Sequence, residues 1–313
     1  MTKPIEDKLS KIPIVNVLVK FLKKIKLLGL EGLSFYDLLE LYIIGIVKGA
    51  LTTRASAIAF SFFTALFPFL LFVLIVIPYV PIDDFKIEFL RFLDSFLPPN
   101  TSEFFFQNIF ENIDQSQRGG LVSSVFLLSL ALMANGVSAV FSGFENSYHD
   151  PLIRNVLRQY LYALGVALIL AFLLIFTIVV LGYFQIYVVQ KVLDVLKNRG
   201  YQVESQTVFW FDIAKYMFFV MMVYLATATL YYFGTKEGRN SKFFSVGALF
   251  TTILIIVTSY LFGIYIENFA QYNKLYGSIG ALLILMFYLW LNANILLLGY
   301  ELNASLNKLR KSC

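Results

Sequence analysis

The stretch QYLYALGVALILAFLLIFTIVVLGYFQIYVVQ, residues 159–190, contains no Asp, Glu, Lys or Arg in 32 consecutive positions. A helix of about 20 apolar residues is long enough to cross the hydrocarbon core of a bilayer. The stretch is longer than that minimum, so it predicts a transmembrane helix that is tilted or extends beyond the lipid.

The rest of the chain agrees with this interpretation. Apolar and aromatic residues make up 59% of the 313 positions and charged residues only 14%, whereas soluble domains carry about 25% charged residues. Five further uncharged stretches are long enough to span, at residues 55–80, 119–144, 216–235, 243–266 and 275–300. The expected fold is therefore all-α, a polytopic membrane helix bundle with six transmembrane helices and additional cytoplasmic and external amphipathic helices.

The charges outside the spans predict the orientation of the chain in the membrane. With the N-terminus inside, the cytoplasmic segments carry 17 of the Lys and Arg residues and the external segments carry 8. Cytoplasmic loops of membrane proteins are enriched in these residues. Both ends of the chain are therefore expected in the cytoplasm, although the loop before residue 216 is more basic than this rule favours.

Three regions follow from these spans. Residues 1–53 are expected to form cytoplasmic amphipathic helices, residues 54–304 the transmembrane domain, and residues 305–313 a short cytoplasmic tail. The basic helix expected at 14–28 suits either an anionic lipid surface or the underside of the protein itself. Residues 81–118 are expected to form an external helical loop, rich in Phe, that lies on lipid or covers the bundle.

Residues suited to catalysis are scarce. His149 is the only histidine and Cys313 the only cysteine, and no metal-binding or phosphate-binding motif occurs. The spans contain no charge, which argues against a buried proton relay. We therefore expect no enzyme activity, no cofactor, no metal and no nucleic acid partner; membrane lipids are the expected partners, and the oligomeric state is left open.

Polar amides are the main chemical groups inside the spans. Asn135 lies near the middle of the second span, and Asn292 and Asn294 lie within the sixth. An amide in hydrocarbon needs a partner, so these side chains are expected to face other helices or a wet cavity. They are candidates either for lining a substrate path or for fastening helices together.

Three more residues are singled out by position. Arg54 marks the cytoplasmic start of the first span and Glu301 the cytoplasmic end of the last, so we expect them to lie at one depth and to pair across the bundle. Pro68 removes one helical hydrogen bond in the middle of the first span and is expected to kink it. Such a kink is either a hinge or a fixed feature of the shape.

Several motifs resemble the YihY/BrkB family, whose members were formerly labelled ribonuclease BN. The resemblance is carried by RASAIAFSFFTALFP at 54–68, VGAL at 246–249, YGSIG at 276–280 and GYELNA at 299–304. It implies a bacterial inner-membrane protein of six spans. The absence of a carboxylate and histidine cluster argues against the nuclease label.

Two functions are weighed. The first is a membrane transporter or facilitator that moves a lipid or another amphipathic envelope component across the cytoplasmic membrane. The alternative is a non-transporting scaffold or envelope-assembly protein, which would need the same helix packing but no polar path. No ATP-binding motif is present, so transport would be facilitated, ion-coupled or dependent on a partner.

Overall fold

A computed structural model describes residues 19, 21–26, 34–36, 40, 50–76, 119–145, 156–190, 205–234, 242–269 and 278–312. Within these ranges every named element is helical, which confirms the all-α fold. The elements are α4 (Leu51–Val76), α8 (Gly119–Glu145), α9 (Val156–Tyr183), the π-helix η3 (Phe184–Gln190), α11 (Ser205–Gly234), α13 (Val246–Phe269) and α15 (Ser278–Ser312).

The helices follow the uncharged stretches closely, with two extensions. α8 matches its predicted span almost residue for residue, and α9 with η3 covers the whole long stretch. α11 begins at Ser205, so Asp212 and Lys215 belong to a helix and not to the preceding loop. α15 runs on to Ser312, beyond the expected end of its span at Tyr300. Charged residues do not end these two helices, because a helix continues readily beyond the lipid when its polar residues reach water.

Five of the helices, α8, α9, α11, α13 and α15, are long and apolar enough to cross a membrane. The expected first span, 55–80, continues past the end of α4 at Val76 into residues outside the described ranges. The count of six spans is therefore not confirmed. The five helices that are long and apolar enough to span show a multi-pass helical membrane protein.

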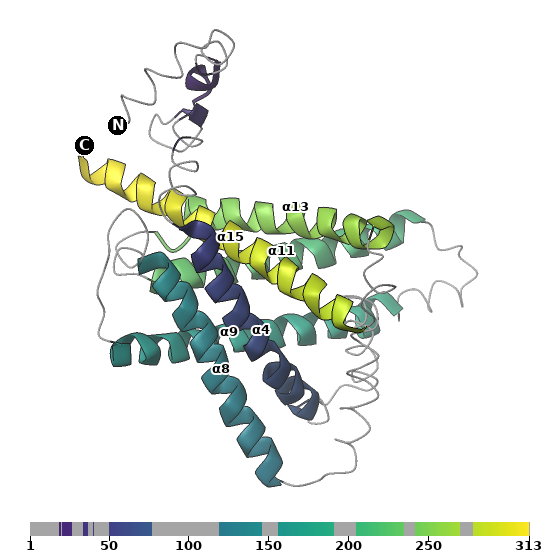
Figure 1. The fold of residues 1–313 in the computed structure, drawn as a ribbon. Helices are drawn as coiled ribbons and strands as arrows, with labels where there is room; N and C mark the ends of the chain where they lie inside the picture. Colours follow the sequence, from purple (N-terminus) through teal and green to yellow (C-terminus); the bar gives the residue numbers. More distant parts are fainter. Residues whose placement is uncertain are drawn as a thin grey trace.

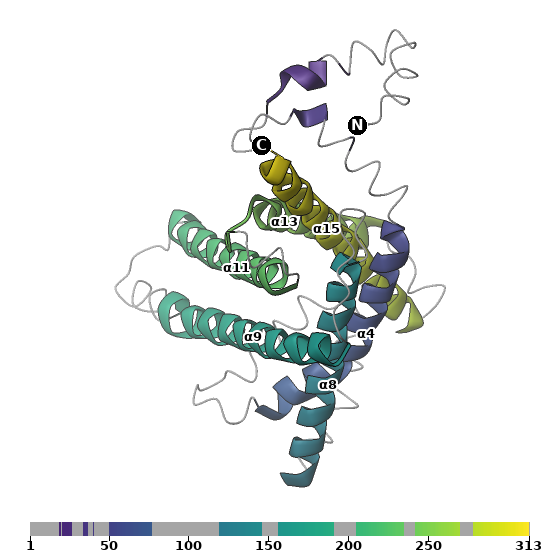
Figure 2. The ribbon, with the colours of Figure 1, turned by 90° about the vertical axis from the view of Figure 1, so that its left-hand side faces the viewer.

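The α-helices of the described ranges, from α4 to α15, form a ring in chain order. Each packs mainly on the helices before and after it, and α15 closes the ring on α4. Figure 2 shows this order, with α13 and α15 above, α11 and α9 on one side, and α8 and α4 on the other. Helices on opposite sides of the ring contact each other much less than neighbours do.

Among the described residues, the ring is packed most tightly at one end. The term packed end is used for the end of the ring at which α4, α9 and α13 begin and at which α8, α11 and α15 end. The helices converge there and diverge toward their other ends (Figure 1). The largest fully buried side chains, apart from Ser129, all lie in the half of their helix next to this end: Ile58, Val137, Val140, Phe141, Phe144, Thr251, Thr252 and Leu297.

Much of the predicted periphery lies outside the described residues. This includes the external loop 81–118, His149, Cys313 and most of residues 1–53. The expected helix 14–28 is wrong at its end, because the described helical residues stop at Lys24 and Lys26 pairs with Ser34 in an isolated antiparallel bridge.

Candidate functional site

A buried ion pair joins α4 and α15 at the packed end. Nη2 of Arg54 lies 3.1 Å from Oε1 of Glu301, and the two side chains are only 9% and 6% exposed. Arg54 is in the first turn of α4, and Glu301 is in the part of α15 that approaches it. The ion pair predicted from the matching depths of these residues is therefore present.

The same guanidinium also holds a third helix. Nη1 of Arg54 donates a hydrogen bond of 2.7 Å to the carbonyl oxygen of Gly143. Gly143 is in the last turn of α8, where carbonyl groups have no partner within the helix and the helix dipole favours a cation. Arg54 thus ties α4, α8 and α15 together. Its Nε is buried without a hydrogen-bond partner among the described residues.

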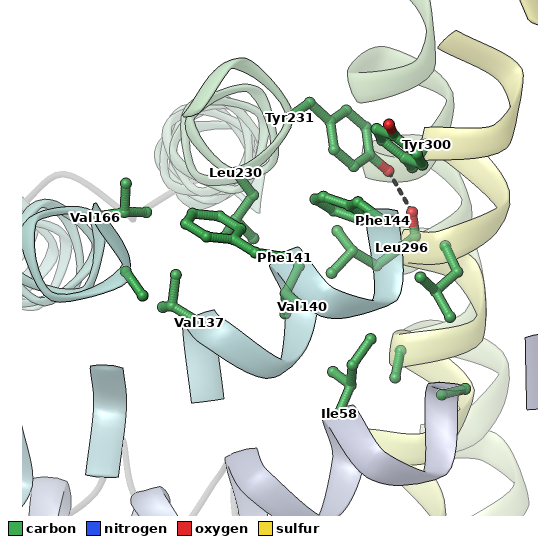
Figure 3. Packing of buried hydrophobic residues seen from close by; sticks show 14 of the residues in the cluster. Ile58, Val137, Val140, Phe141, Phe144, Val166, Leu230, Tyr231, Leu296 and Tyr300 are labelled. Carbon is green, nitrogen blue, oxygen red and sulfur yellow. Dashed lines mark hydrogen bonds between the residues drawn. The ribbon is translucent and has the colours of Figure 1, made fainter. Parts of the chain in front are cut away.

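An aromatic and hydroxyl cluster lies in the same region (Figure 3). The Tyr231 hydroxyl donates to the carbonyl oxygen of Leu296 at 2.7 Å and lies 2.5 Å from the Thr251 hydroxyl. Phe144 stacks on Tyr300 with ring centroids 4.2 Å apart and meets Tyr231 edge to face. Side chains of α8, α11, α13 and α15 therefore meet at one place and close the packed end.

We expect Tyr231→Phe to lower the free energy of unfolding by about 1 kcal/mol, because hydrogen bonds between membrane helices contribute roughly this much. Thermal unfolding in detergent micelles would measure the loss. The matched control is Tyr260→Phe, because Tyr260 is exposed and its hydroxyl should contribute little. Equal stability of the two variants would show that the Tyr231 hydrogen bond does not hold the helices.

α15 also caps the start of α13. Oδ1 of Asn303 accepts a hydrogen bond of 2.8 Å from the Gly247 backbone N–H, while its Nδ2 donates to Oγ of Ser245 at the same distance. Ser245 accepts from the Ala248 N–H and so acts as the N-cap residue of α13. Gly247 and Gly299 bring the two backbones into close approach, since a Cβ at either position would overlap the facing helix.

The three candidate amides do not cross the bundle. Asn292 and Asn294 donate to carbonyl oxygens of their own helix, those of Tyr288 at 2.9 Å and Trp290 at 2.7 Å. Asn135 is exposed on α8, so a place in the lining of a wet cavity, the alternative to facing another helix, stays a prediction. A backbone carbonyl one turn earlier accepts an amide N–H in place of a neighbouring helix. Oδ1 of Asn292 is buried without a partner in the described part of the chain.

Pro68 lies inside α4, which continues to Val76. Its carbonyl oxygen accepts a short hydrogen bond, 2.5 Å, from the Ser129 hydroxyl of α8. Ser129 is fully buried there. This contact anchors the proline turn to the neighbouring helix, and a hinge at Pro68 stays a prediction.

These contacts position helices and do not form a set of catalytic groups. Within the described residues, no group of three or more His, Cys, Asp and Glu side chains is close enough to hold a metal ion. The arrangement is that of a polytopic membrane protein with an ionic and aromatic closure at one end.

The chain belongs to the family described as virulence factor BrkB, whose family model matches residues 45–312. The resemblance noted in the sequence motifs is thereby confirmed. The match covers every helix from α4 to α15, so the packed end and its ion pair fall within the family region.

Individual relatives carry different names. The putative ribonuclease-like protein YfkH of Bacillus subtilis is 24% identical over 259 residues, which are 83% of this chain and 91% of that protein. A UPF0761 membrane protein of Psychrobacter is 31% identical over 77 residues, and one of Xanthomonas oryzae is 38% identical over 64 residues. These two matches cover only 14% and 15% of those proteins. No solved structure matches the chain.

Proposed function

We propose that this protein is a transporter or facilitator that moves a lipid or another amphipathic envelope component across the bacterial cytoplasmic membrane. We further propose that both ends of the chain are cytoplasmic, which places the packed end on the cytoplasmic side. Asn135 and Asn294 are proposed to contact the polar part of the substrate, and Pro68 to act as a hinge of α4.

The observation that supports this function is the one-sided packing of the ring. Transporters expose a central site to each side of the membrane in turn, by moving one group of helices against another. A ring that is closed at one end and diverges at the other has the shape expected of one such state. The Arg54–Glu301 ion pair joins the first helix to the last, so it lies where the closed end would have to open.

The amides support the proposal in a second way. Asn135 is exposed on an apolar helix. Asn294 is half-buried, and its amide donates a hydrogen bond to a carbonyl oxygen of its own helix. Among the described residues, neither side chain makes a hydrogen bond to another helix. A polar group of this kind in a span is costly unless it meets water or a polar ligand.

Reconstitution into liposomes tests this function directly. Vesicles of phosphatidylethanolamine and phosphatidylglycerol would contain a trace of fluorescent phosphatidylethanolamine, and dithionite would quench the label in the outer leaflet. We expect wild-type protein to make the inner pool accessible. An Asn135→Leu, Asn294→Leu variant should slow this exchange by about tenfold, which corresponds to a barrier higher by about 1.4 kcal/mol.

The matched control replaces Leu127 and Leu283 with Ala, since both are exposed apolar residues on the same two helices. This control should exchange lipid at the wild-type rate. No exchange by the wild type would overturn the lipid version of the proposal and favour a scaffold or a solute exporter. If the control variant slowed lipid exchange as much as the Asn variant, the amides would not have the proposed role in substrate contact.

A further inference from the structure

A small polar cluster lies on the other half of the ring, away from the packed end. Nζ of Lys215 is 2.6 Å from Oδ1 of Asp212, one turn earlier on α11. The same ammonium donates to Oε1 of Gln185 at 3.1 Å. Gln185 belongs to the π-helix η3, so the cluster lies at the seam between α11 and η3. Short π-helical segments occur frequently at functional sites.

The depth of this cluster follows from the helix geometry. Gly234, at the packed end of α11, packs against Phe144. Lys215 precedes it by nineteen positions on the same helix, which at about 1.5 Å per residue is a distance of about 28 Å. The hydrocarbon core of a bilayer is about 30 Å thick. If Gly234 is at one surface of the hydrocarbon core, Lys215 is at the level of the headgroups on the opposite surface.

The neighbouring side chains agree with this depth. Trp210 and Tyr216 on α11 are 66% and 70% exposed, and Tyr183, at the end of α9, is 52% exposed. Exposed Trp and Tyr gather at the boundary between hydrocarbon and headgroups, where the ring is apolar and its polar atom is hydrated. The cluster of Lys215, Asp212 and Gln185 therefore borders both the lipid chains and the headgroup layer.

We propose that this cluster binds the headgroup of a phospholipid that carries both a phosphate and a primary amine, in the leaflet remote from the packed end. The Lys215 ammonium has three donors, of which contacts among the described residues use two. The third is available to a phosphate oxygen. The Asp212 side chain is 45% exposed, and its second carboxylate oxygen, which has no partner among the described residues, accepts from the lipid amine.

The chemistry of Lys215 and Asp212 selects among lipid classes. A primary ammonium donates hydrogen bonds to a carboxylate, whereas the quaternary ammonium of a choline headgroup has no N–H to donate. A glycerol headgroup has no cation to meet Asp212. The site is therefore expected to prefer phosphatidylethanolamine over both alternatives. The preference does not depend on transport and would hold for a scaffold as well.

Lipid retention by the purified full-length protein tests this site. Native mass spectrometry from detergent micelles would compare bound dioleoyl phosphatidylethanolamine, phosphatidylcholine and phosphatidylglycerol, all with the same chains. Wild-type protein should retain the ethanolamine lipid about threefold to fivefold more than the choline lipid, as expected for one exposed charged contact. Asp212→Asn should abolish that preference, and Lys215→Gln should weaken retention of all three lipids.

Two further variants keep the result interpretable. Lys242→Gln removes an exposed cation at the packed end and should leave the preference unchanged. Asp212→Glu keeps the carboxylate and should preserve the preference, even if substitution at this position alters the stability of the helix. Equal retention of the ethanolamine and choline lipids by the wild type would overturn the proposal. An unchanged preference in Asp212→Asn would also overturn it and leave an ordinary surface ion pair.

Discussion

Replacing Glu301 with Gln is expected to lower the free energy of unfolding by about 3 to 5 kcal/mol, the usual cost of removing one partner of a buried ion pair. Gln has nearly the same shape, so the loss comes from the charge. Arg54 would keep its hydrogen bond to Gly143, but its positive charge would be buried without a counter-ion. Chemical or thermal unfolding in detergent micelles would measure the change.

Two other variants show whether the pair itself is responsible. In the swapped variant Arg54→Glu, Glu301→Arg, opposite charges face each other again, and stability should return in part. Recovery should be incomplete because a carboxylate at position 54 would meet the Gly143 carbonyl oxygen. Asp212→Asn breaks a pair that is much more exposed and should cost less than about 1 kcal/mol. A swapped variant no more stable than the single variants would contradict the pairing.

Gly299→Ala is expected to destabilise the protein by about 1 to 3 kcal/mol, and by more if the helices cannot separate. A Cβ at this position would overlap the Thr251 hydroxyl and lie 2.6 Å from the Tyr231 hydroxyl. α13 and α15 would have to move apart, which would weaken the Asn303 cap and the Tyr231 hydrogen bonds together. Thermal unfolding and the yield of monodisperse protein in detergent would report the effect.

Other glycines of the chain provide the control. A Cβ at Gly165 in α9 or Gly263 in α13 would meet nothing within 4 Å. Ala at these positions should be neutral or stabilising by up to about 1 kcal/mol, since Ala favours a helix more than Gly does. Combining Gly299→Ala with Thr251→Ala removes the worst overlap and should cost less than the sum of the single changes. Equal behaviour of Gly299→Ala and Gly165→Ala would show that this helix contact is not tight.

Much of the fold could be read from the amino-acid sequence. A long stretch without charge can satisfy its backbone in lipid only as a helix, so each predicted span overlaps a helix in the described part of the structure. The pairing of Arg54 with Glu301 could also be predicted, because each is the charged residue that bounds an uncharged stretch. Two such residues on the same side of the membrane share a depth, and the structure brings them within 3.1 Å.

Other residues of the packed end could hardly be predicted from the sequence. Tyr231, Thr251 and Gly299 lie on apolar helices that contain many other Tyr, Thr and Gly residues. Small and hydroxyl residues at helical spacing are the only sequence feature that could have indicated them. For Asn135, by contrast, the amide was conspicuous in the sequence, and the structure places it at an exposed position of α8.

The sequence by itself determined which uncharged segments form long helices, which charges bound them and, through these, that the first and last predicted spans meet at one end. Only the tertiary structure decided the ring order, the close contact of Gly247 and Gly299, and the seam where Lys215 meets Gln185. The reason is physical. In a soluble helix the apolar stripe identifies the buried face, but in lipid both the buried and the exposed faces are apolar, so the sequence does not record which face meets a neighbour.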